Sequence, residues 1–156
     1  MTMRQPDLLI GLSDEQAEQA LALGSRISLP GGAELFGLGD EADRLFLIER
    51  GRVKLTLPIQ LRGREQDIFV EERMPGQTVG WSALIPPYRF TMKATTLIDT
   101  ELIALSRERL RALFAASSEV GYQVSLNLAG VIGQRLQLFQ AMWLREIQRV
   151  VEVRCA

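Results

Sequence analysis

Apolar and polar residues alternate in short runs from Arg26 to about Leu105. Alternation with a period of two is typical of strands that bury one face. Clusters of glycine with proline, aspartate or arginine separate the runs and provide the turn chemistry that short loops need. Evenly spaced short strands with such turns favour a β-sandwich or a jelly-roll barrel. The runs are Arg26–Leu29, Glu34–Phe36, Leu45–Ile48, Arg52–Leu57, Gln66–Val70, Thr91–Thr96 and Thr100–Leu105.

Helical periodicity replaces this alternation at both ends of the chain. Ser13 and Gln16 have the spacing of a capping box, and Gly24 is placed to stop the helix that they begin. A short helix opens at Ser106, and a longer one begins near Ser117 and meets no proline. We therefore expect a chain that is mainly β with flanking helices: an N-terminal helical segment over residues 1–24, a β-roll over 25–116 and a long helix over 117–156.

The long helix carries one continuous apolar stripe. Such a helix would measure about 50 Å, whereas a compact domain of this size has a radius of gyration of about 15 Å. Part of the stripe must then overhang the domain, and a partner helix would keep it out of water. The stripe predicts a homodimer whose interface contains Leu128, Ile132, Leu136, Phe139, Trp143, Ile147 and Val150.

Gly130 and Gly133 lie inside the same helix, where each glycine costs up to about 1 kcal/mol relative to alanine. Close approach of another backbone would offset that cost. The neighbouring backbone is either a partner helix or the roll of the same chain.

The stretch Gly80–Ala94 has the features of an anion-binding loop. A glycine allows close backbone approach, small residues then form a short helical turn, and two prolines end it. Arg89 adds a cation beside this turn. The alternative is a tight turn between two strands with an ordinary surface arginine. The candidate ligand contacts in this stretch are Gly80, Trp81, Ser82, Ala83, Arg89 and Thr91.

Composition narrows the range of functions. The chain has 47% hydrophobic and 24% charged residues and a net charge of -1, so no strong basic field favours nucleic acid or a membrane surface. It contains no histidine and a single cysteine, Cys155. Ser-His-Asp catalysis, the usual zinc sites, histidine-ligated haem and iron–sulfur clusters are thereby excluded. We expect a cytoplasmic protein without cofactor or metal, not an enzyme and not associated with a membrane.

The order of these motifs resembles the cyclic nucleotide-binding domain of the catabolite-activator-protein (Crp/Fnr-like) superfamily, over about residues 33–149. Gly39 and Gly51 stand at the expected places of the first glycine motif, and Pro75–Gly80 matches the second. The phosphate-binding cassette and a long helix follow. The resemblance implies an antiparallel jelly-roll β-roll (a double-stranded β-helix, cupin-like) that binds a small ligand inside. It also implies a long C-terminal helix that pairs two subunits across the ligand sites.

The cassette departs from the family at its ligand contacts. Trp81 replaces the glutamate that holds the ribose hydroxyl, and an indole donates one hydrogen bond and accepts none. Trp81 therefore stacks on a flat ligand or simply fills the core. Arg89 is the candidate for the phosphate-binding arginine, one position off in an ungapped match. Phe139 and Gln140 replace the hydroxyl residues that contact adenine. These departures predict a ligand other than cyclic AMP, nucleotide-like or anionic.

A non-catalytic regulatory sensor is the function that we expect from these features. One alternative is a degenerate, ligand-free module for dimerisation or protein interaction. Another is the sensor fragment of a Crp/Fnr-like transcription regulator, because the chain stops where the family's helix-turn-helix would begin, after Arg149. We expect no direct DNA binding by this chain. A cupin-like enzyme is disfavoured by the absence of histidine.

Overall fold

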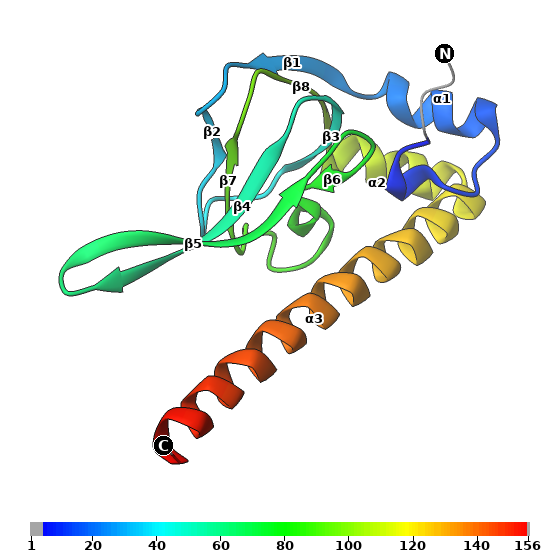
Figure 1. Cartoon of the computed structure of the whole chain (residues 1–156). Helices are drawn as coiled ribbons and strands as arrows, with labels where there is room; N and C mark the ends of the chain where they lie inside the picture. Colours follow the sequence, from blue (N-terminus) through cyan, green and yellow to red (C-terminus); the bar gives the residue numbers. More distant parts are fainter. Residues whose placement is uncertain (1–4, 156) are drawn as a thin grey trace.

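The computed structural model describes residues 5–155, which form a β-roll with helices at one end and a long C-terminal helix (Figure 1). Within the described residues, four short helical elements and eight strands precede that long helix. In chain order the elements are η1 (Asp7–Leu9), α1 (Asp14–Ala22), β1 (Ser25–Leu29), β2 (Glu34–Phe36), β3 (Arg44–Arg50), β4 (Val53–Leu61), β5 (Arg64–Arg73), β6 (Thr78–Val79), η2 (Trp81–Leu84), β7 (Lys93–Thr96), β8 (Thr100–Ser106), α2 (Arg107–Ala116) and α3 (Ser118–Cys155).

The strands form two four-stranded antiparallel sheets, in the orders β1-β8-β3-β6 and β2-β7-β4-β5. β3 is apolar at four consecutive positions, Leu45–Ile48, and all four are buried because both of its faces are covered. Phe46 stacks on Phe36 of the other sheet, whereas Leu45 and Leu47 pack towards the helices. Among the described residues the sheets do not close into one barrel, so the jelly-roll, cupin-like arrangement stays a prediction.

Two strands differ from the predicted bounds for identifiable reasons. β4 continues through Pro58 to Leu61, because beyond Thr56 it pairs only with β5 and its other edge needs no N–H donor. β7 begins at Lys93, so Thr91 lies in the preceding loop and not in the strand. β6 contains only Thr78 and Val79, which is too short for a periodicity to reveal.

The hairpin of β4 and β5 projects beyond the roll (Figure 1). Its outer residues are exposed, from Gln60 as far as Phe69. The turn at Arg62 and Gly63 has positive φ at both positions, 52° and 76°, which matches the twist of the two strands.

The N-terminal helix begins as the sequence predicts. Ser13 accepts a hydrogen bond from the Gln16 backbone at 3.1 Å, and the Gln16 side chain accepts one from the Ser13 backbone at 3.0 Å. α2 is capped by Ser106, whose hydroxyl accepts from the Arg109 N–H at 3.2 Å. The Asn127 side chain of α3 donates to two carbonyls near η1 and so fixes the N-terminal segment on the long helix.

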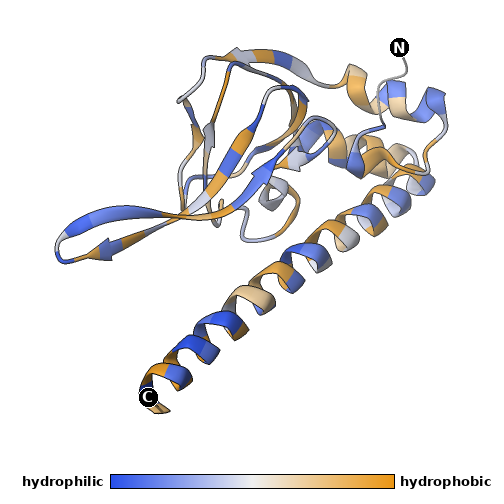
Figure 2. Ribbon diagram, viewed as in Figure 1, coloured by the Kyte–Doolittle hydropathy of each residue, from blue (hydrophilic) through white to orange (hydrophobic). Residues whose placement is uncertain are grey.

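The long helix has a body face and a free half. Its buried residues are Val120, Val124, Leu128, Val131 and Arg135, spaced by three or four. Beyond Met142 the described residues are exposed and the helix leaves the body (Figure 1). Hydrophobic residues nevertheless continue along the ribbon of this half (orange in Figure 2). Trp143 is 64% exposed there, and Val150 is 47% exposed. No helix within residues 5–155 is both long and apolar enough to cross a membrane.

The surroundings of Gly130 and Gly133 bear on which backbone lies close to them, a partner helix or the roll of the same chain. Apart from the backbone of the helix itself, a Cβ added at Gly130 or Gly133 would meet no atom of residues 5–155 within 4 Å. The roll of the same chain is therefore not the close neighbour that would explain them.

Candidate functional site

The cassette begins at Gly80, which needs to be a glycine. Its φ is +80°, a left-handed conformation that side chains disfavour, and an added Cβ would lie 2.9 Å from the Phe90 ring. The chain then forms the single helical turn η2, in which Ser82 and Ala83 are buried. The predicted turn is thus present, and it ends at Leu84, before Pro86.

Arg107, the first residue of α2, holds the cassette loop against the roll. Its guanidinium donates to the Ala42 carbonyl at 2.6 Å and to the Ala83 carbonyl at 3.4 Å. The same group lies over the Tyr88 ring, with 4.0 Å between Cζ and the ring centroid. These contacts join the cassette loop, at Ala83 and Tyr88, to the first residue of α2 and to the segment before β3.

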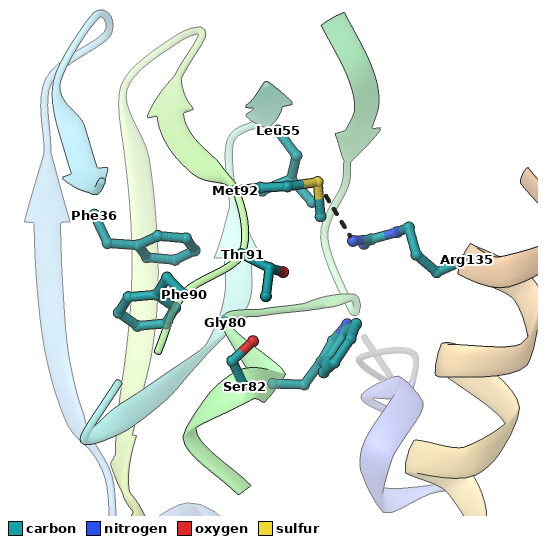
Figure 3. A pocket seen from close by; sticks show the side chains of 9 residues that line it. Phe36, Leu55, Gly80, Ser82, Phe90, Thr91, Met92 and Arg135 are labelled. Carbon is teal, nitrogen blue, oxygen red and sulfur yellow. Dashed lines mark hydrogen bonds between the residues drawn. The ribbon is translucent and has the colours of Figure 1, made fainter. Parts of the chain in front are cut away.

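A small hollow lies between the cassette, β4 and α3 (Figure 3). Its volume is about 20 Å³, which is room for about one water molecule. A nucleotide-sized ligand would require the surrounding side chains to move. The lining residues are Phe36, Leu55, Gly80, Trp81, Ser82, Phe90, Thr91, Met92 and Arg135.

Arg135 is the charged group of this hollow. It comes from α3, and its side chain points towards Met92 on the cassette side (Figure 3). It is only 7% exposed, and its Nη1 donates to the Met92 sulfur at 3.8 Å. Its Nε lies 2.6 Å from Glu71 Oε2, in an ion pair. Burial lowers the pKa of the Arg135 guanidinium, and the charge of Glu71 opposes this shift.

Glu71 belongs to a network that joins four elements. Arg73 Nη1 lies 2.8 Å from Glu71 Oε1, and Arg73 Nη2 lies 3.1 Å from Asp7 Oδ2 in η1. Arg73 Nε donates to the Thr78 carbonyl at 3.1 Å. Asp7 in turn accepts from the Thr78 hydroxyl at 2.5 Å and from the Thr78 N–H at 3.1 Å. The network ties the N-terminal segment, β5, β6 and α3 together beside the hollow.

The structure brings four of the six predicted cassette contacts to the hollow: Gly80, Trp81, Ser82 and Thr91. Ala83 is fully buried and does not line it. Trp81 is half-buried, packs on the core and has its ring 5.8 Å from the Arg135 guanidinium. Both interpretations of Trp81, stacking on a ligand and filling the core, remain compatible with this position.

Arg89 does not line the hollow. It is exposed, its backbone pairs with Glu41, and its guanidinium donates to the Gly39 carbonyl at 3.4 Å. This placement differs from the expectation that Arg89 faces an anion in the cassette. The physical reason is the short loop after η2, in which Phe90 turns inward and is 6% exposed while Arg89 turns outward.

Phe139 and Gln140 lie one turn beyond Arg135 and do not line the hollow either. Phe139 is half-buried and packs against the core, and Gln140 is exposed. Their predicted ligand contact stays a prediction.

The predicted interface residues differ in burial. Leu128 is 7% exposed and lies in the core of its own chain, which differs from the expectation. Ile132 and Phe139 are half-buried. The exposed members are Leu136 at 58%, Trp143 at 64%, Ile147 at 43% and Val150 at 47%.

Sequence reasoning missed the role of Arg135 and Glu71. The signal for Arg135 was present, because it follows Val131 by four residues and Leu128 by seven, so a charge stands on the apolar body face of the helix. Glu71 gave no such signal, since it stands beside a second glutamate, Glu72, in β5.

Comparison with known proteins identifies the fold and its relatives. The sequence profile named cyclic nucleotide-binding domain matches residues 26–117. The Cyclic AMP receptor protein of Thermus thermophilus is 31% identical over 135 residues, which cover 86% of this chain and 59% of that protein. The Pycsar effector protein XpPycTIR of Xanthomonas perforans is 29% identical over 145 residues, 91% of this chain and 44% of that protein. This chain thus spans about half the length of the curated relatives it matches.

Solved structures agree. The crystal structure of the Thermus thermophilus catabolite activator protein has a TM-score of 0.73 and 30% identity, covering 91% of this chain and 63% of that chain. The N-terminal domain of a transcriptional regulator from Streptomyces coelicolor has a TM-score of 0.71 and 29% identity, covering 85% of this chain and 92% of that chain. Together with the glycine motifs, the cassette and the long helix, these matches show that the chain belongs to the cyclic nucleotide-binding domain family, with relatives among the Crp-like regulators.

Proposed function

We propose that this chain is a non-catalytic sensor that binds a small anionic ligand of the cyclic-nucleotide type between the cassette and α3. The observation that carries the proposal is the buried guanidinium of Arg135. A guanidinium has five N–H donors. Within residues 5–155 its partners are one carboxylate, Glu71, and a thioether sulfur, Met92. A buried cation with spare donors beside the cassette is suited to an anion.

We further propose that cyclic AMP is not the preferred ligand. By the resemblance, Trp81 stands where the family's glutamate accepts the ribose hydroxyl, and an indole cannot accept. A buried hydroxyl left without its acceptor costs about 1–3 kcal/mol. Trp81 instead offers a flat apolar face beside a cation.

Signalling would pass through α3. The same helix carries Arg135 on its body face and the exposed apolar residues Leu136 and Trp143 beyond it. A ligand at Arg135 can shift α3 between two positions only if it binds one of them better. A homodimer through the free half of α3 would carry that shift to the second subunit. A cytoplasmic setting and a role within a longer Crp-like regulator belong to the same proposal.

A second candidate, a ligand-free interaction module, is favoured by the small size of the hollow, about 20 Å³. A thermal-shift screen separates the two candidates. It would contain the 3′,5′-cyclic nucleotides of adenine, guanine, cytosine and uracil, with the uncharged nucleosides as controls. The sensor predicts a saturable rise in melting temperature with at least one cyclic nucleotide and none with its nucleoside. No shift with any of them at millimolar concentration would favour the ligand-free module.

A further inference from the structure

Glu71 lies where the roll meets α3. It is carried by β5, opposite Leu55 of β4, which lines the hollow. Its side chain is 23% exposed, and each of its carboxylate oxygens lies within ion-pair distance of an arginine. Oε1 lies 2.8 Å from Arg73 Nη1, and Oε2 lies 2.6 Å from Arg135 Nε.

We propose that Glu71 is an internal competitor for Arg135, and that it sets the affinity of the site for anions. Its carboxylate takes the guanidinium edge that an anionic ligand would otherwise use and helps to keep the hollow closed. The inference rests on the proposed function, because it assumes that anions bind at Arg135.

The contacts make Glu71 suited to this role. A carboxylate has the same charge as a cyclic phosphodiester, so the two compete for one guanidinium. Glu71 is also held in place by Arg73, whose side chain is only 5% exposed. When a ligand takes Arg135, Glu71 keeps Arg73 as its partner and is not left as an unpaired buried charge. Separating Glu71 from Arg135 therefore costs less free energy than breaking an isolated buried ion pair.

The size of the hollow also supports competition between Glu71 and a ligand for Arg135. With the pair formed, about 20 Å³ is open, and Arg135 lies against Met92 at 3.8 Å. A ligand larger than a water molecule has to separate Arg135 from these neighbours. Since Arg135 belongs to α3, that separation couples ligand entry to the position of the long helix.

The first test needs no identified ligand. Glu71→Gln keeps the shape of the side chain and removes its charge. Glu72→Gln is the matched control, because Glu72 is adjacent and, within residues 5–155, its ion pair is with the more exposed Arg52 at 3.8 Å. All proteins carry Trp143→Phe, since Trp143 is 64% exposed and would hide the fluorescence of Trp81. Quenching by iodide, an anion, is compared with quenching by neutral acrylamide.

A freed Arg135 should concentrate iodide beside Trp81. We expect the iodide quenching constant of Glu71→Gln to rise roughly twofold or more, with little change for acrylamide and none in Glu72→Gln. An unchanged iodide constant would overturn the proposal, and so would an equal rise with both quenchers, which indicates loosening of the fold. Glu71→Ser provides the same comparison if circular dichroism shows that Glu71→Gln is not folded.

The second test uses the cyclic nucleotide that gives the largest thermal shift. Competition predicts that Glu71→Gln binds it about tenfold more tightly than the unsubstituted chain. Equal or weaker binding would overturn the proposal, the latter because Glu71 would then contact the ligand itself. If no cyclic nucleotide binds any of the proteins, the proposed function fails for this ligand class, whereas the iodide comparison still decides the role of Glu71.

Discussion

Arg135 and Arg89 differ in burial and therefore in how strongly each can attract an anion. Arg135 is 7% exposed, lines the hollow and pairs with Glu71. Arg89 is exposed and reaches the Gly39 carbonyl at 3.4 Å. A charge in a partly desolvated site attracts an anion more strongly than one in solvent, because water screens the latter. We therefore assign the main electrostatic attraction for an anion to Arg135.

The same contrast predicts a small effect at Arg89. Arg89→Ala and Arg89→Lys should each change the affinity for a cyclic nucleotide by less than about threefold. Each should also change the free energy of unfolding by less than about 0.5 kcal/mol, because the side chain is on the surface. Calorimetric titration and urea denaturation measure the two quantities. A loss of affinity of tenfold or more in Arg89→Ala would restore the cassette arginine as the principal anion contact.

Patterns in the sequence were sufficient for residues whose backbone role is local. Gly80, Ser82 and the capping pair Ser13 and Gln16 are where local chemistry places them. The direction in which Arg89 points depends on the three-dimensional course of its loop, and no periodicity encodes it. The pairing of Arg135 with Glu71 joins residues 64 positions apart in sequence, so only the fold brings them together.

At the scale of elements, the strands and helices were mostly predictable and their connections were not. Alternation located β1 to β5, β7 and β8, because each buries one or both faces against the core. β6 was not predicted, because its two residues, which pair with Phe46 and Leu47 of β3, are too few to show a periodicity. The network that links η1, β5, β6 and α3 was not predicted either, because it consists of charged and polar residues, whose pairing a hydrophobic pattern does not indicate.

That link predicts a large stability effect at Arg73. Its side chain is 5% exposed and contacts Glu71, Asp7 and the Thr78 carbonyl. Arg73→Ala removes the cation shared by two partly buried carboxylates and should cost about 3–5 kcal/mol of the free energy of unfolding.

Arg52→Ala is the control for this prediction. Arg52 is 51% exposed and lies 3.8 Å from Glu72. Loss of such a surface pair should cost about 0–1 kcal/mol. Urea denaturation of both variants gives the comparison. Equal, small effects at the two positions would show that the buried network does not stabilise the fold.

At the scale of the whole molecule, the free half of α3 is the feature that a monomer leaves unexplained. Leu136, Trp143, Ile147 and Val150 are each more than 40% exposed, and the last three lie on the half of the helix that has left the body of the chain. Exposed apolar residues at this spacing are suited to a partner helix. A Cβ added at Gly130 or Gly133 would meet no atom of residues 5–155 within 4 Å, apart from the backbone of the helix itself, so a partner backbone has room to come close there.

This arrangement predicts a homodimer at micromolar concentration. Leu136→Glu combined with Trp143→Glu should give a folded monomer, because both side chains are exposed in the single chain and would become buried charges only in a dimer. Sedimentation equilibrium measures the mass, and circular dichroism checks the fold. A monomeric unsubstituted chain, or a variant that remains dimeric, would contradict the assigned interface.

The most direct test of the account is the affinity of the site with and without the Arg135 guanidinium. Calorimetry would compare the unsubstituted chain and Arg135→Gln, titrated with the cyclic nucleotide that binds most tightly in the screen. Because a hydrogen-bonded charge contributes about 1.5–3 kcal/mol, the variant should bind about tenfold to a hundredfold more weakly. The account also predicts that this nucleotide is not cyclic AMP. Equal affinities for the two proteins would contradict the central claim that Arg135 on the long helix holds the anion.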